Sequence, residues 1–130
     1  MSRPRLLLID DEPALAQFVA SAARECGYEP IVTRSEPQFR AEYTELRPDM
    51  VALDLGMPDA DGVQFLRFLA EQGFRGPVLI ISGFDRRVLE SAFRLGEALG
   101  LTMVGPLEKP TPLEELEEIL REMKPTLAGS

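Results

Sequence analysis

The stretch Leu6-Leu7-Leu8-Ile9-Asp10-Asp11 joins a continuous apolar run to two adjacent acids. Similar short apolar segments recur at residues 31–32, 50–53, 78–81 and 101–104. Most of these segments are continuous rather than alternating, as expected for parallel strands that are covered on both faces. They therefore predict the strands of a buried parallel sheet.

Segments with helical spacing lie between the predicted strands. We expect the first helix between Pro13 and Gly27, because proline suits a first helical turn and glycine ends a helix. Later helices are expected to begin at Ser35, at Asp61, near Asp85 and at Pro112, with the last ending before Pro125. The predicted apolar face is Val88, Ala92, Leu95 and Leu99 in the fourth helix, and Leu113, Leu116, Leu120 and Met123 in the fifth.

The predicted strands and helices alternate along the whole chain. This order favours an α/β fold, a doubly wound parallel sheet of five strands with helices on both faces and right-handed crossovers. We expect one domain over residues 1–124 and a flexible tail over residues 125–130.

Composition narrows the classes of function. A net charge of −8 on 130 residues argues against direct binding of nucleic acid, which needs clustered Lys and Arg. No apolar run is long enough to span a bilayer, and no signal-peptide pattern is found. The single Cys26 cannot form an internal disulfide. We therefore expect a cytoplasmic globular protein with no membrane contact.

The chain contains no histidine. Catalytic systems of the Ser-His-Asp and Cys-His types are excluded, and so is a phosphohistidine. A zinc site is improbable as well, because it would have to use carboxylates and one thiol. Chemistry in this chain must depend on carboxylates, hydroxyls, lysines and a bound hard cation.

Polar side chains follow four of the five predicted strands. Asp10 and Asp11 come after the first, Asp54 ends the third, Ser82 ends the fourth, and Lys109 lies just after the fifth. The carboxyl ends of parallel strands share one edge of the sheet, where doubly wound folds bind their ligands. We therefore expect these side chains to converge.

Three carboxylates at such a place repel one another, by about 4 kcal/mol per pair at 4 Å and an effective dielectric near 20. A cation would allow all three to stay ionised, and oxygen ligands select a hard ion such as Mg²⁺. A carboxylate beside Mg²⁺, with a lysine and a hydroxyl opposite, suits in-line phosphoryl transfer. Asp54 would then be the nucleophile and Lys109 would stabilise charge on the phosphoryl oxygens.

Simpler roles are open for each of these residues. Asp10 and Asp11 also suit a helix start, and Asp54 suits a loop acid at a strand end. Ser82 suits an ordinary turn, and Lys109 suits a solvated position before a proline. Asp59 and Asp61 are better explained as turn and capping residues than as ligands.

Four motifs in order resemble the response-regulator receiver family of two-component signalling, and the resemblance spans residues 5 to about 124. These motifs are Leu8-Ile9-Asp10-Asp11-Glu12, residues 54–62 from Asp54 to Gly62, Ile80-Ile81-Ser82-Gly83 and Lys109-Pro110. The resemblance implies the flavodoxin-like fold with strand order 2-1-3-4-5.

The resemblance also implies a role for each matching residue. Asp54 would be the phosphoacceptor, and Ser82 and Lys109 would contact the phosphoryl group. Mg²⁺ would be bound by Asp11, Asp54 and the backbone carbonyl of Gly56, with Asp10 acting mainly through water. The Lys109-Pro110 peptide bond would be cis.

Two positions depart from the family pattern. Pro106, after Gly105, stands where the family usually has the Tyr or Phe that swings during switching, and proline cannot swing. Gly56 and Phe84 stand where polar groups often guide the hydrolytic water. We therefore expect slow self-dephosphorylation.

The leading hypothesis is a stand-alone receiver that takes a phosphoryl group from a histidine kinase or a histidine phosphotransfer protein. It would signal to an unknown downstream protein through its fourth and fifth helices. A second hypothesis, motivated by Pro106, is a receiver-like interaction module that works without phosphorylation. A third is a Mg²⁺-dependent phosphohydrolase, which ranks low because such enzymes need a general acid at the position of Gly56.

Overall fold

The computed structural model describes residues 3–55, 62–83 and 86–128, and within them five strands alternate with five helices. The strands are β1 Arg5–Ile9, β2 Glu29–Thr33, β3 Met50–Asp54, β4 Pro77–Ser82 and β5 Thr102–Glu108. The helices are α1 Pro13–Glu25, α2 Glu36–Leu46, α3 Gly62–Glu71, α4 Arg86–Ala98 and α5 Leu113–Ala128. All four strand pairings are parallel and the order is β2-β1-β3-β4-β5, which confirms the predicted fold class.

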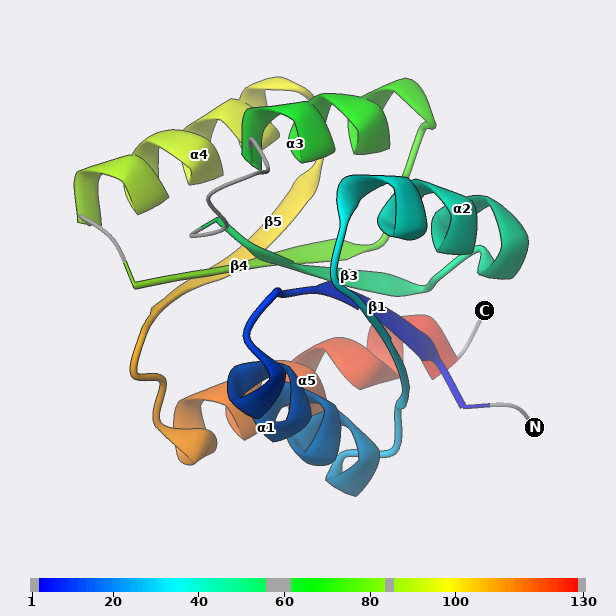
Figure 1. Cartoon of the computed structure of the whole chain (residues 1–130), viewed down its shortest axis with the longest axis vertical. Coiled ribbons are helices and arrows are strands. Elements are labelled where there is room, and N and C mark those ends of the chain that lie inside the picture. Colours follow the sequence, from blue (N-terminus) through cyan, green and yellow to red (C-terminus); the bar gives the residue numbers. More distant parts are fainter. Residues whose placement is uncertain (1–2, 56–61, 84–85, 129–130) are drawn as a thin grey trace.

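Helices cover both faces of the sheet, with α1 and α5 on one side and α2, α3 and α4 on the other (Figure 1). Each face has its own hydrophobic core, and successive strand residues belong to opposite cores. In β1, for example, Leu6 and Leu8 pack toward α1 and α5, whereas Leu7 and Ile9 pack toward α2 and α3. This arrangement explains why the strand segments are continuously apolar.

Several helix ends follow the sequence signals. Ser35 caps α2, because its Oγ accepts a hydrogen bond from the backbone N–H of Gln38 at 3.3 Å. Gly27 follows α1 with φ +89°, a conformation that favours glycine after a helix. The predicted helix starts at Asp61 and Asp85 lie outside the described residues.

The fifth strand is longer than the apolar run at residues 101–104 predicts, because it continues to Glu108. Its pairing with β4 shifts register between Leu79 and Ile81, opposite Gly105 and Pro106. Gly105 has φ +89°, and a Cβ there would lie 2.9 Å from Cδ1 of Leu79. The Lys109-Pro110 peptide bond is cis, as expected, and so is Gly105-Pro106.

The predicted apolar face of α4 is correct for Ala92, which is buried, and for Leu95, which packs against the core, but it is wrong for Val88 and Leu99. Its buried residues are Leu89, Ala92 and Gly96, while Val88 is 52% exposed and Leu99 is 37% exposed. The reason lies in Gly96, where a Cβ would collide with the side chain of Met103. The missing side chain lets α4 approach β5 closely on this side, so Leu89 and Gly96 are buried beside Ala92 in place of Val88 and Leu99.

The fifth helix also differs from its prediction. Leu116 and Leu120 are buried as expected, but Leu113 is 46% exposed at the helix start. The helix does not end before Pro125, since it runs to Ala128. Proline in a helix interior costs one backbone hydrogen bond but need not end the helix. A flexible tail over residues 125–130 stays a prediction.

Tyr28 ties α5 to the start of β2, a contact that sequence spacing does not predict. The side chain is fully buried, and its hydroxyl donates a hydrogen bond to the carbonyl of Leu120 at 2.6 Å. Burial raises the pKa of this hydroxyl, so it stays protonated and remains a donor.

We expect Tyr28→Phe to lower the free energy of unfolding by roughly 1–2 kcal/mol, because a buried hydrogen bond is lost. Chemical denaturation monitored by circular dichroism measures this change. Tyr43→Phe, at a half-buried ring on the other face, is the matched control with an expected change within about 0.5 kcal/mol. Equal effects of the two substitutions would contradict the role given to Tyr28.

Candidate functional site

The carboxyl ends of the inner strands carry the predicted polar residues. Asp10 follows β1, Asp54 ends β3 and Ser82 ends β4, and all three side chains are buried. Asp11 is exposed beside them, and Lys109 follows β5. The structure thus brings together at one edge the residues that the sequence places far apart.

Three carboxylates form a cluster at this edge. Asp10, Asp11 and Asp54 each offer one oxygen, and these oxygens all lie within 4.8 Å of one another. Two of the three carboxylates are buried, where an uncompensated negative charge is costly. The cluster can therefore hold a divalent cation, and its oxygen donors favour a hard ion. The carbonyl of Gly56, the fourth predicted ligand, lies outside the described residues.

Burial changes the protonation of Asp10. Burial raises its pKa to about 7, a hydrogen bond from the backbone N–H of Glu12 opposes the rise, and the charge of Asp54 adds to it. The N–H of Glu12 lies 2.9 Å from Oδ1 of Asp10. In the metal-free protein, Asp10 thus loses its proton near neutral pH.

Lys109 supplies the positive charge of the site. Its Nζ lies 3.1 Å from Oδ2 of Asp54 and 3.4 Å from Oε1 of Glu12. Burial works to lower the pKa of Lys109, but Asp54, Asp10 and Glu12 outweigh burial and the pKa is raised. The lysine therefore stays charged and holds the predicted nucleophile by a short ion pair.

Glu12 is a site residue that the sequence reading assigned no role. It occupies the N-cap position of α1, where Ser, Thr, Asp or Asn is preferred, and its side chain makes no capping hydrogen bond. Its carboxylate instead pairs with Lys109. The sequence signal that could have identified Glu12 is a glutamate at an N-cap position, where glutamate is not a preferred residue.

Backbone hydrogen bonds hold these strand ends in register. The N–H of Asp10 donates to the carbonyl of Thr33 at 3.1 Å, and the N–H of Leu55 donates to that of Ile81 at 3.1 Å. The N–H of Lys109 donates to the carbonyl of Ser82 at 2.9 Å. Because Ser82 and Lys109 are joined in this way, the hydroxyl and the amine are carried on one rigid edge.

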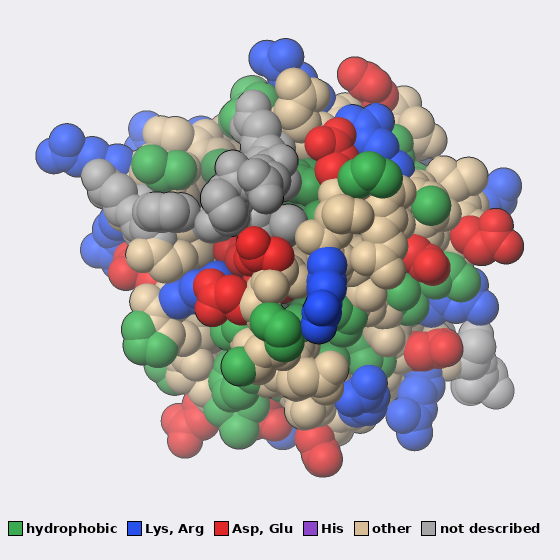
Figure 2. Space-filling view, in the orientation of Figure 1, with side chains coloured by type: hydrophobic (Ala, Val, Ile, Leu, Met, Phe, Trp, Pro, Cys, Tyr) green, Lys and Arg blue, Asp and Glu red, His purple; other side chains and the backbone are tan. Residues whose placement is uncertain are grey.

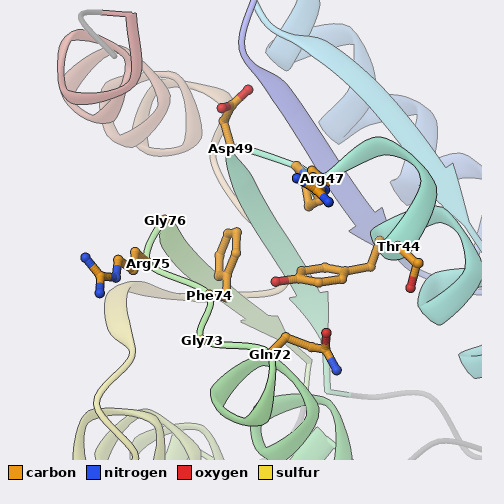
Figure 3. A pocket seen from close by; sticks show the side chains of 10 residues that line it. Thr44, Arg47, Asp49, Gln72, Gly73, Phe74, Arg75 and Gly76 are labelled. Atoms are coloured by element: carbon orange, nitrogen blue, oxygen red, sulfur yellow. The ribbon is translucent and has the colours of Figure 1, made fainter.

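Acidic side chains gather beside a basic one on the surface left of centre in Figure 2, above α1. A separate hollow of about 620 Å³ lies at the opposite edge of the sheet, between the ends of α2 and α3. Figure 3 shows Asp49 and Arg75 pointing away from Phe74 there. That hollow contains none of the predicted site residues, so the acidic cluster is identified by its chemistry and not by concavity.

No helix in the described part of the chain combines the length and apolar character that crossing a bilayer requires.

Comparison with known proteins gives consistent matches. A family model described as the response regulator receiver domain matches residues 6–121. The transcriptional regulatory protein TrcR of Mycobacterium tuberculosis is 33% identical over 119 residues, which are 90% of this chain and 44% of TrcR. The first curated relatives are longer proteins, of which the chain spans between 24% and 52%.

Solved structures agree with the fold. A response regulator from Colwellia psychrerythraea is 28% identical, with a TM-score of 0.77 over 96% of this chain and 99% of that chain. The chemotaxis protein CheY4 of Vibrio cholerae is 24% identical, with a TM-score of 0.78 over 94% of this chain and 99% of that chain.

We predict that Mg²⁺ raises the melting temperature more at pH 8 than at pH 6. The pKa of Asp10 is about 7 in the folded protein, against 3.8 for an ordinary aspartate side chain. The protonated group therefore stabilises the metal-free fold most at low pH, and this stability is lost as the pH rises through 7. A Mg²⁺ ion at this cluster would need the deprotonated form of Asp10, so its stabilising effect should grow over the same pH range.

Thermal unfolding with and without MgCl₂ at several pH values tests this prediction. Asp10→Asn, which cannot titrate, should remove the pH dependence of the Mg²⁺ effect between pH 6 and 8. A Mg²⁺ effect that is constant over this range in the unsubstituted chain would contradict the assignment.

Proposed function

The chain belongs to the response regulator receiver domain family of two-component signalling, and on this basis we propose that it accepts a phosphoryl group on Asp54. One observation carries the proposal. Lys109 Nζ lies 3.1 Å from the buried carboxylate of Asp54, and oxygens of Asp10, Asp11 and Asp54 lie within 4.8 Å of one another. A nucleophile, a cation and metal ligands are thus close together.

The proposed reaction transfers a phosphoryl group from a histidine kinase or a histidine phosphotransfer protein. An oxygen of Asp54 attacks phosphorus, the bond between phosphorus and the donor imidazole breaks, and the electron pair of that bond stays on the imidazole nitrogen. The product is an aspartyl phosphate. Lys109, already charged and within reach, balances the negative charge on the transferred oxygens.

Asp10, Asp11 and Asp54 would hold Mg²⁺ beside the nucleophile, with the carbonyl of Gly56 as a further proposed ligand. When bound, Mg²⁺ neutralises charge on the phosphoryl oxygens and orients them for in-line attack. Asp10 and Asp54 are buried by the strand ends, which keeps water from most of the cluster and strengthens its electrostatics.

The signal would leave the site through Ser82. Ser82 pairs with Glu108 of β5, and the carbonyl of Ser82 accepts a hydrogen bond from the N–H of Lys109. A shift of Ser82 toward the phosphate would therefore reach β5 directly. The proposed output is a shift between two pre-existing conformations, read by a downstream protein over α4 and α5. The protein would act in the cytoplasm, and its chemistry would be limited to its own phosphorylation and dephosphorylation.

Pro106 supports a second candidate, an interaction module that works without phosphate. It occupies β5 at the register shift, where the family usually has an aromatic side chain that changes position. A pyrrolidine ring cannot make that change. Any phosphorylation-dependent output in this chain would therefore need Ser82 and the β4–β5 edge instead.

Incubation with acetyl phosphate and MgCl₂ should add the mass of one phosphoryl group to the intact chain. Asp54→Asn should abolish this adduct because the nucleophile is lost, and Lys109→Met should slow its formation by about tenfold or more. Asp49→Asn, at the amino end of β3, is the matched control and should label normally. No adduct on the unsubstituted chain would favour the phosphate-independent module.

The aspartyl phosphate should be long-lived, with a half-life of minutes or more, because Gly56 and Phe84 offer no polar group to guide water. Loss of the adduct from the isolated chain after removal of acetyl phosphate measures this half-life. Phe84→Glu should shorten it. A half-life of seconds in the unsubstituted chain would refute the expectation.

A further inference from the structure

A groove of about 470 Å³ lies between α3 and α4. We call it the α3–α4 groove, and its lining includes Leu55, Val63, Arg87, Val88, Ala92 and Leu95. Val88 is 52% exposed, one of the few large apolar side chains that the described surface leaves open. Apolar surface of this kind beside charged residues is typical of sites that bind another protein.

The groove follows from the packing of α4. This helix contacts β5 through Gly96 and buries Leu89, which turns Val88 outward. On the opposite wall Gly62 has no side chain, and a Cβ there would collide with Leu55. Leu55 therefore lies against the start of α3 and forms part of the floor.

The floor is directly connected to the proposed phosphorylation site. Leu55 follows Asp54 in the chain, and its N–H donates to the carbonyl of Ile81 at 3.1 Å. Ser82 is the next residue along β4. A change at Asp54 or Ser82 thus reaches the groove through one peptide unit.

The charge around the groove is opposite to that of the whole chain. The chain carries a net charge of −8, whereas α4 carries exposed arginines at positions 86, 87 and 94 against exposed Glu90 and Glu97. Arg86 pairs with Glu108 at 3.0 Å, so the positive charge at the groove comes from Arg87, which lines it, and from Arg94. Figure 2 shows Lys and Arg side chains around the end of α4 at the left of the view. By contrast, α5 begins with acidic Glu114 and Glu115.

We propose that the α3–α4 groove binds an acidic amphipathic helix of a partner protein. Apolar side chains of the helix would contact Leu55, Val88 and Leu95, and its carboxylates would lie near Arg87 and Arg94. This is the helix-in-groove mode of recognition, with charge selecting the partner. Binding rests on the groove alone, whereas its use as an output surface beside the face of α4 and α5 rests on the proposed function.

A second copy of the chain is a less suitable occupant. Two facing grooves would bring their arginines together. A copy that inserted its acidic α5 would make a head-to-tail contact, which extends into a filament unless a ring closes. A separate acidic helix meets neither obstacle.

The test uses a fluorescein-labelled synthetic helical peptide with Leu at positions i, i+3, i+4 and i+7 and Glu on both flanks. Fluorescence anisotropy against the full chain should show saturable binding. A matched peptide with Lys in place of Glu should bind about tenfold more weakly or worse, because like charges then meet. Equal binding of the two peptides, or no binding of the Glu peptide, overturns the proposal.

Substitutions locate the site. Arg87→Glu and Val88→Ser should each weaken binding of the Glu peptide by roughly tenfold. Arg75→Glu, the same charge change at the opposite edge of the sheet, should leave binding unchanged. Weakening by Arg75→Glu equal to that by Arg87→Glu overturns the proposal.

Two measurements separate the possible failures. All three variants should keep their circular dichroism spectra and label normally with acetyl phosphate, and Asp54→Asn should still bind the peptide. Peptide binding without phosphoryl labelling would reject the proposed function and keep the groove. Self-association in sedimentation velocity that Arg87→Glu abolishes would assign the groove to a second copy and overturn the proposal.

Discussion

The burial of negatively charged carboxylates at one edge of the sheet is the main constraint on this structure. Asp10 and Asp54 are almost fully buried, and Lys109 forms an ion pair with Asp54 that compensates part of this charge. Buried carboxylates without a partner destabilise a protein strongly, so the fold must hold Lys109 in place. It does so through the backbone hydrogen bond between Lys109 and Ser82 and through the ion pair with Glu12.

This unfavourable concentration of charge is typical of functional sites rather than of stabilising ones. The two hydrophobic cores on either side of the sheet offset its cost, because they are built from strand residues that are almost fully buried. The rigid sheet holds the charges together, and a divalent cation or a phosphoryl group can then change their balance. The apolar residues along the strands thus supply stability, and the polar residues at the ends of the same strands supply reactivity.

Much of the site could be predicted from sequence because it depends on strand ends. A polar residue that ends a buried apolar run, such as Asp54 or Ser82, must lie at the sheet edge. Strand order, and hence which of these residues are neighbours, came from the family resemblance. Glu12 and Tyr28 were missed, because their partners Lys109 and Leu120 lie about ninety residues away and spacing does not reveal them.

The errors have a common physical cause. Apolar spacing predicts that α4 is amphipathic, but it does not distinguish between two adjacent faces. Close approach at Gly96 decided that choice, and it is a tertiary effect. The helix through Pro125 likewise shows that local propensity can be overridden. Local signals were sufficient for the existence of the elements but not for their orientation.

Pro106 has a further consequence for how this molecule meets others. β5 is an outer strand of the sheet, so one side of its backbone faces no neighbouring strand. The unpaired backbone groups of an edge strand can pair with a strand of another chain, and a proline or an irregular register makes such pairing less favourable. With Pro106 and the shift beside Gly105 in this strand, lateral extension of the sheet is blocked there. Partners are therefore left to recognise side chains and helices rather than to add a strand.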